Sequence, residues 1–203
     1  MINKNFRKVL PVILTAALLG GCSTLSKNNQ KQFYQTWSIR KVQLANLKNW
    51  EARGSVGIKN KHTNDLAKFI WQENSTNFTL KVTSTFGLGG VTILGDKDHV
   101  ILLEGATKTI TAKSAEDLMY QELGWSLPIT NLSKWILGLP AENAPYKPQF
   151  DQFKQLTDLC QQGWMIKYTD YQEINNFTLP TKIILINHDL QIKLAITRWK
   201  IKS

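Results

Sequence analysis

Apolar and polar residues alternate with a period of two over most of the chain after residue 50, and this pattern predicts β-strands with one buried face. Polar turn sequences, such as residues 73–77 and 95–98, separate neighbouring runs. Short strands in unbroken succession indicate an antiparallel sheet, because only antiparallel neighbours can be joined by tight turns. The predicted strands are residues 50–58, 66–71, 78–82, 91–94, 100–103, 107–112, 152–159, 163–168, 182–186 and 191–201.

Helical spacing replaces the alternation in three places. Residues 31–48 place several apolar side chains roughly on one face of a helix. Ser114 begins a capping-box-like sequence and predicts a helix to about residue 123. A third, short helix is predicted over residues 131–137, because Pro140 bars it from continuing.

The last predicted strand changes the parity of its apolar residues. They occupy even positions up to Ile196 and odd positions from Trp199 onward. A β-bulge near Thr197 and Arg198 restores a single inward face, because a bulge inserts one extra residue into one strand of a pair. We therefore expect a bulge at this point.

Together these elements predict a mainly β fold with helices, in a single domain over residues 31–203. A curved antiparallel sheet of about ten or eleven strands forms an incomplete, half-open barrel, with the helices as a lid over an apolar cavity. The chain has seven tryptophans, and each is either core filler or cavity lining. The residues expected to line the cavity are Trp50, Trp71, Leu80, Val82, Val91, Ile93, Trp135, Ile136, Trp164 and Trp199.

The N-terminus carries an export signal rather than a membrane span. A basic segment precedes the apolar run from Val9 to Leu19, which is shorter than the roughly 20 residues of a spanning helix. Leu19-Gly-Gly-Cys22 then follows the bacterial lipobox pattern, in which the cysteine sulfur receives a diacylglycerol and the signal is cut before it. Residues 1–21 are therefore predicted to be a lipoprotein signal peptide, Cys22 the lipidation site and residues 22–30 a lipid-anchored tether.

The formal net charge of +10 falls to +7 when the three basic residues of the signal are removed, and this excess still favours anionic surfaces. Nucleic acid is the usual partner of so basic a chain, but an exported lipoprotein has little access to it. Acidic lipid headgroups therefore remain as a partner, beside the alternative of a solvated basic surface with no specific role. Of the two cysteines, Cys22 is used by lipid, which leaves Cys160 without an intramolecular disulfide partner.

The motif search favours neither an enzyme nor a cofactor site. His62, His99 and His188 lie in or beside predicted turns, and none has a second histidine or cysteine at metal-ligand spacing. The glycines of residues 87–90 lack the Gly-Lys-Ser/Thr continuation of a phosphate loop, and no serine lies in a Gly-x-Ser-x-Gly turn. We expect no metal, no cofactor and no enzymatic activity, with carboxylates that meet in space as the remaining alternative.

One turn is apolar where hairpin tips are usually polar. Residues 83–90 join two predicted strands and carry Phe86 and Leu88 among glycines and small polar residues. Exposing a large apolar side chain forgoes about 1.5 to 3 kcal/mol of burial free energy. Either an apolar partner receives this turn, or Phe86 folds back onto the rim of the barrel.

Several motifs resemble those of the LolB family of outer-membrane lipoproteins, over nearly the whole chain after the signal. The sharpest is Trp135-Ile-Leu-Gly-Leu-Pro140. The supporting motifs are Trp50-x-x-Arg53-Gly54, Phe69-Ile-Trp-Gln72, Gly163-Trp164, Leu179-Pro180 and Ile192-Lys-Leu-x-Ile-x-x-Trp199. The resemblance implies a half-open antiparallel barrel with a helical lid, which the alternation indicates independently.

In that family, a protruding loop with a Pro-Leu-Gly pattern presents a leucine that promotes transfer of cargo into the membrane. The matching residues here are Thr85-Phe-Gly87, so Phe86 stands in place of the leucine, and Leu88 can share its role. The resemblance thus implies a membrane-insertion loop of Phe86, Gly87 and Leu88. Arg53 matches a family arginine near the lid, where it is either a lid contact or an arginine paired at a strand surface.

The function that the resemblance implies is transport rather than catalysis. A lipid-anchored protein of the outer membrane, facing the periplasm, would accept acylated lipoproteins from a LolA-type carrier in its apolar cavity. It would then insert them into the inner leaflet of that membrane, since acyl chains do not cross water unaided. We expect a monomer with no nucleic-acid partner. The alternative is a general lipid-binding or structural envelope lipoprotein that uses the same cavity.

Overall fold

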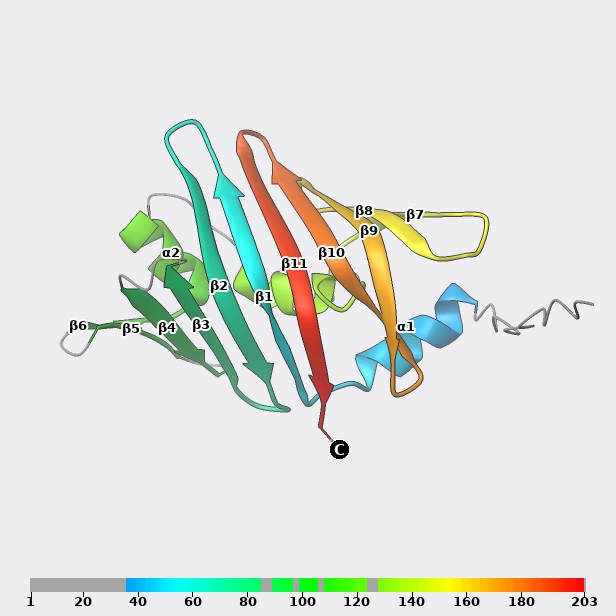
Figure 1. Cartoon of the computed structure of the whole chain (residues 1–203), viewed down its shortest axis with the longest axis horizontal. Coiled ribbons are helices and arrows are strands. Elements are labelled where there is room, and N and C mark those ends of the chain that lie inside the picture. The colour runs from blue at the N-terminus through cyan, green and yellow to red at the C-terminus, as the bar shows by residue number, and fades with distance from the viewer. Residues whose placement is uncertain (1–35, 85–88, 97–98, 106–107, 124–127, 203) are drawn as a thin grey trace, which may run out of the picture. The chain divides into compact units, whose positions relative to one another are not determined.

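The computed structural model describes residues 36–84, 89–96, 99–105, 108–123 and 128–202. Their strands form an antiparallel sheet of eleven, in the order β6-β5-β4-β3-β2-β1-β11-β10-β9-β8-β7 (Figure 1). The expected half-open antiparallel sheet with helices is therefore confirmed. The strands are β1 (Trp50–Lys59), β2 (Asn64–Glu73), β3 (Phe78–Ser84), β4 (Gly90–Gly95), β5 (Val100–Glu104), β6 (Lys108–Ala112), β7 (Tyr146–Phe150), β8 (Leu156–Gln161), β9 (Trp164–Ile174), β10 (Phe177–Asn187) and β11 (Leu190–Ile201).

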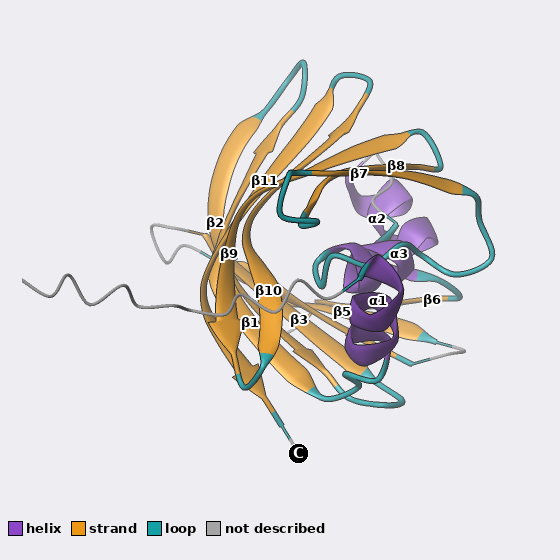
Figure 2. Cartoon of the chain, turned by 90° about the vertical axis from the view of Figure 1, so that its right-hand side faces the viewer, coloured by secondary structure: helices purple, strands orange, loops and turns teal. Residues whose placement is uncertain are grey.

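The sheet curls around the helices without closing. β1 and β11 pair at its centre, and each half continues from there as a meander to an edge strand, β6 on one side and β7 on the other. Figure 2 shows the strands curving around the helices, which lie on the concave side. Because β6 and β7 are not neighbours in the sheet, the barrel stays open along both of these edges.

The helices follow the expected order with shifted ends. The first lies within the predicted residues 31–48, of which residues 31–35 fall outside the described part of the chain. The predicted cap of the second is confirmed, since the Asp117 backbone N–H donates to Ser114 Oγ over 3.0 Å. The third begins at Ile129 rather than at residue 131. The bounds are α1 (Trp37–Ala45), α2 (Ala115–Leu123) and α3 (Ile129–Trp135).

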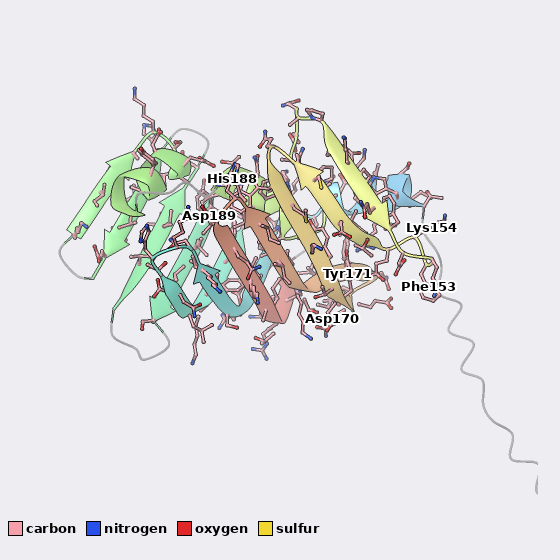
Figure 3. All side chains as sticks on the ribbon, turned by 90° about the horizontal axis from the view of Figure 1, so that it is seen from above. Phe153, Lys154, Asp170, Tyr171, His188 and Asp189 are labelled. Atoms are coloured by element: carbon pink, nitrogen blue, oxygen red, sulfur yellow. The ribbon has the colours of Figure 1, made fainter. Side chains whose placement is uncertain are left out.

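The single strand predicted over residues 152–159 is wrong. Two strands, β7 and β8, flank a turn in which Asp151 Oδ1 accepts bonds from the backbone N–H groups of Phe153 and Gln155, each over 2.8 Å. Phe153 lies at the outer end of this hairpin (Figure 3). Pro148 concealed β7 in the sequence, and it is tolerated there because β7 is an edge strand that needs fewer ladder bonds.

The bulge predicted in the last strand is confirmed. Arg53 of β1 pairs with Arg198, while the next residue of β1 pairs with Ile196, so Thr197 is left over. Thr197 Oγ1 donates to the carbonyl oxygen of Arg53 over 3.2 Å. The extra residue turns Trp199 to the same face as Ile196, and both side chains are buried.

The two strands meet so closely beside the bulge that β1 needs a glycine there. A Cβ atom at Gly54 would lie 2.0 Å from the carbonyl oxygen of Ala195, whereas at Gly57 the nearest atoms are 4.0 Å away. We expect Gly54→Ala to lower the free energy of unfolding by about 2 kcal/mol or more, because the backbone of β11 must shift. The matched control Gly57→Ala should change it by less than about 1 kcal/mol. Urea unfolding measures both, and equal losses would contradict the close approach.

Candidate functional site

An apolar cavity of about 320 Å³ lies between the concave face of the sheet and α3. This volume is within the usual range of small-molecule sites. Two of its lining residues are charged, Glu104 and Lys108, and the other lining residues are apolar. The lining consists of Val56, Ile58, Phe69, Trp71, Leu80, Val82, Val91, Ile93, Leu102, Glu104, Lys108, Ile129, Leu132, Ile136, Ile192 and Leu194.

The walls are built by strand register. Side chains of alternate residues share a face of a strand, and antiparallel pairing places such residues opposite one another on successive strands. Two adjacent rows therefore run across β2 to β5. One row is Phe69, Val82, Val91 and Glu104, and the next is Trp71, Leu80, Ile93 and Leu102.

The roof is the apolar face of α3 and the residue that follows it. Ile129, Leu132 and Ile136 are spaced by three and four residues, so they lie on one side of the helical turn and face the cavity. All three are nearly inaccessible to solvent. The chain then turns at Gly138, whose φ of 77° lies in the left-handed region that favours glycine after a helix.

A buried glutamine attaches this roof to the other half of the sheet. Gln161, at the end of β8, is 3% exposed. Its Oε1 accepts from Trp135 Nε1 over 2.9 Å and from the Ala141 N–H over 2.8 Å. Its Nε2 donates to the carbonyl oxygens of Ala141 and Ala144 over 2.9 and 3.1 Å. Tyr168 of β9 adds a bond from its hydroxyl to the carbonyl oxygen of Trp135 over 2.9 Å.

Six of the ten residues predicted to line the cavity do so: Trp71, Leu80, Val82, Val91, Ile93 and Ile136. The other four are tryptophans outside the lining, and they pack as core. The Trp50 ring lies 5.5 Å from that of Trp199, and the Trp135 ring lies 6.0 Å from that of Trp164. The indole N–H groups of Trp135 and Trp199 bond to Gln161 and to the Pro180 carbonyl, so each is satisfied inside the protein.

Ten lining residues were not predicted, because the expected lining was drawn mainly from the tryptophans and from two strands. The alternation was the signal that could have found most of them, since they continue the inward faces of β1, β2, β5 and β11. The two charged members, Glu104 and Lys108, had no such signal, because charged residues at strand ends are typical of turns. The unpredicted members are Val56, Ile58, Phe69, Leu102, Glu104, Lys108, Ile129, Leu132, Ile192 and Leu194.

Arg53 has a partner on its own strand. Its Nε donates to Glu51 Oε1 over 2.5 Å, and Gln72 Nε2 donates to Glu51 Oε2 over 2.7 Å. These hydrogen bonds hold the pKa of Glu51 low, at about 2. Since Ala52 between them is buried toward the core, Glu51 and Arg53 project to the opposite, outer face of the sheet. Arg53 is thus paired with a buried carboxylate on its own strand, while its own side chain is 42% exposed.

Glu73 is a half-buried carboxyl group on the inner face of β2, near Lys134 of α3. It shares the parity of Trp71, whose Nε1 donates to Glu73 Oε2 over 3.0 Å. Burial raises the pKa of Glu73 to about 7, partly offset by the Trp71 bond and the charge of Lys134. Glu73, which is hydrogen-bonded to the cavity-lining Trp71, therefore changes its charge near neutral pH.

The remaining sequence candidates are the insertion loop and the two cysteines. Phe86, Gly87 and Leu88 lie outside the described residues, as does Cys22. Cys160 is free and exposed. The described residues contain no cluster of histidine, cysteine, aspartate or glutamate that could hold a metal ion. Within the same described ranges, no helix has the length and apolar character to cross a membrane.

The fold and site define an open antiparallel sheet wrapped around helices, with an apolar cavity between the sheet and α3. The chain belongs to the LolB family: the family model for outer membrane lipoprotein LolB matches residues 48–199. Outer-membrane lipoprotein LolB of Coxiella burnetii is 32% identical over 197 residues, which cover 96% of this chain and 93% of that protein. The protein of the same name from Nitrosococcus oceani is 34% identical over 192 residues, covering 94% and 96%.

Solved structures with little sequence similarity share the fold. A LolA superfamily protein from Nitrosomonas europaea superimposes with a TM-score of 0.56 at 11% identity, covering 83% of this chain and 94% of that one. An outer membrane lipoprotein-sorting protein domain from Vibrio parahaemolyticus gives 0.55 at 9% identity, covering 82% and 90%. The architecture is therefore one that tolerates almost complete replacement of the sequence.

The Gln161 network predicts a specific loss of stability. Gln161→Leu leaves the Trp135 indole N–H and the Ala141 N–H and carbonyl group buried without their partners, and we expect it to lower the free energy of unfolding by about 3 kcal/mol or more. The control Gln172→Leu changes the same residue type at an exposed site on β9 and should cost less than about 1 kcal/mol. Urea midpoints compare the two, and similar midpoints would show that the network does not hold the roof.

Because the pKa of Glu73 is raised in the folded state, we expect the free energy of unfolding to fall as pH rises. Its folded pKa of about 7 lies above the ordinary 4.5, so between these values the folded state holds a proton that the unfolded chain has lost. The wild type should therefore lose up to about 3 kcal/mol relative to Glu73→Gln between pH 4.5 and pH 7, with little further change above. Glutamine still accepts from Trp71. The free energy of unfolding is measured with urea from pH 4 to 8.5 for both proteins. If it changes with pH in the same way in the wild type and in the variant, the pKa of Glu73 is not raised.

Proposed function

We propose that this chain accepts acylated lipoproteins from a LolA-type carrier and delivers them to the inner leaflet of the outer membrane. The observation that carries the proposal is the apolar cavity between the sheet and α3, with its fourteen apolar and two charged lining residues. Membership of the LolB family supports it. The role is lipoprotein trafficking, and no step of it breaks or forms a covalent bond.

The physical task is to keep acyl chains out of water during transfer. Each CH₂ group moved from water to an apolar environment gains about 0.8 kcal/mol, so a long chain is held strongly by a bilayer and barely dissolves without one. A cavity of this kind replaces the bilayer for the part of the chain that it covers. Transfer then runs from carrier to cavity to membrane by increasing affinity for the acyl chain, without a nucleotide.

The anchor belongs to the same proposal. Diacylglycerol on Cys22, after removal of residues 1–21, would hold the domain at the membrane through the short segment 22–30. The domain acts as a monomer in this scheme. The lipid of the anchor is of the same kind as the lipid on the cargo.

The loop between β3 and β4 is the proposed membrane-insertion element. Its ends are paired, since Ser84 N–H donates to the Gly89 carbonyl oxygen over 3.3 Å. Val82 and Val91, on the adjoining strand ends, line the cavity. The apolar residues Phe86 and Leu88 therefore belong to a connection that begins and ends directly beside the cavity.

The loop can be separated from the cavity by experiment. Purified wild type should take a radiolabelled acylated lipoprotein from a loaded LolA-type carrier and release it into phospholipid vesicles. Phe86→Glu should accept cargo within about twofold of wild type and lose most delivery to vesicles, because a charge resists entry into the apolar part of a leaflet. Phe86→Leu keeps an apolar side chain and should deliver normally.

A cavity variant gives the opposite pattern and controls for misfolding. Leu80→Glu places a charge in the cavity wall, so acceptance itself should fail while the circular dichroism of the sheet is retained. If wild type takes nothing from an active carrier, the proposal is wrong. Native mass spectrometry that finds free fatty acids bound instead of acylated protein would favour the general lipid-binding alternative.

A further inference from the structure

The two charged residues of the cavity lie together at one of its ends. Glu104 is the last residue of β5 and Lys108 the first of β6, and the register pairs them. Lys108 Nζ donates to Glu104 Oε2 over 3.0 Å, and the two side chains are 49% and 51% exposed. Since β6 is an edge strand, these two lining residues lie at the free border of the sheet (Figure 1).

The opposite end of the cavity is apolar. Ile192 and Leu194 of β11 form it together with Val56 and Ile58 of β1. Six strand-to-strand spacings separate β6 from β11, which is about 29 Å along the curved sheet. One acyl chain spans about half of the ~30 Å hydrocarbon core of a bilayer. The lining residues therefore extend across seven neighbouring strands, a path longer than one acyl chain.

The charged pair at one end of the cavity and the apolar residues at the other allow an acyl chain to bind in only one orientation. The head of an acyl chain carries oxygen atoms, either as a carboxylate or as an ester or amide carbonyl, and burying them among Ile192 and Leu194 would leave them without hydrogen-bond donors. Lys108 offers an ammonium group at the other end. Its bond with Glu104 is an exposed ion pair, which is weak enough for Lys108 to exchange its partner.

We propose that Lys108 binds the oxygen-bearing head of the acyl chain at the β6 border, and that the chain runs from there toward Ile192 and Leu194. Glu104 is a positioning residue, because it holds the ammonium group at the cavity end before the head arrives. This inference rests on the proposed function, since it assigns a direction to the acyl chain that the cavity receives.

Matched amphiphiles test the role of Lys108. The probes are hexadecanoate, its methyl ester and hexadecyltrimethylammonium, each competing with a fluorescent fatty acid for the full-length mature protein. Lys108→Gln should raise the Kd for hexadecanoate about tenfold and for the methyl ester about threefold, while it tightens binding of the ammonium probe. The control Lys81→Gln removes an exposed charge from the outer face of β3, which points away from Leu80 and Val82. It should change all three by less than twofold.

Photo-crosslinking tests the direction. Two hexadecanoate probes carry a diazirine, one beside the carboxylate and the other near the terminal methyl group. We expect the first to label β5 or β6 and the second to label β11 or β1, as located by peptide mass spectrometry. The same peptides labelled by both probes, or the reverse assignment, would overturn the proposal.

The outcomes separate this inference from the function on which it rests. If Lys108→Gln and Lys81→Gln weaken hexadecanoate binding equally, the effect is one of net charge and Lys108 is not the head-group site, yet the cavity still binds acyl chains. If wild type binds none of the probes and accepts no acylated lipoprotein, both proposals fail. If cargo transfer is normal but both diazirine probes label the same peptides, only the proposed orientation of the acyl chain is wrong.

Discussion

Everything at the cavity depends on holding a short apolar helix at a fixed distance from an apolar sheet. Ile129, Leu132 and Ile136 have apolar strands in front of them, and burial alone would draw the two surfaces together until the space between them disappeared. The polar contacts behind the helix oppose this. Gln161 and Tyr168 bind the backbone and indole around Trp135 and tie the roof to β8 and β9. The hydrogen bonds of Gln161 and Tyr168 thus hold α3 in place and keep it from packing fully against the sheet.

The cavity exists because hydrogen bonds hold α3 away from the sheet, and for this reason core residues and cavity-lining residues have the same pattern in the sequence. Trp71 and Trp50 are both inward-facing residues of adjacent strands, and each is almost fully buried. One lines the cavity and the other packs against Trp199 because they lie at different levels along the strands. Alternation reports which face is buried but not what covers it. What covers a buried face depends on the position of α3, and that position is set by contacts between residues far apart in the chain.

The fold itself was more predictable than the site, because its signals are local. The strands of the first half follow the alternation to within a few residues, and even the bulge at Thr197 was visible as a change of parity. β7 was missed where Pro148 interrupts the pattern, and only the edge position of that strand makes the proline acceptable. The pairing of Glu104 with Lys108 was equally hidden, since it becomes part of the cavity only once β5 and β6 are folded against each other.

The sheet has two unpaired edge strands, β6 and β7. Unpaired edges invite association with other strands, and this sheet limits the hazard with a short β6 of five residues and a proline in β7. Closing the barrel would remove the hazard altogether, but an enclosed ligand could then leave only through an end. An open border lets a bound chain leave sideways along its length, which suits the proposed delivery into a leaflet. At the β6 border the proposed head-group site is about half exposed, so a chain held by Lys108 can leave there by exchanging that contact for water, and its tail can then follow along the open edge.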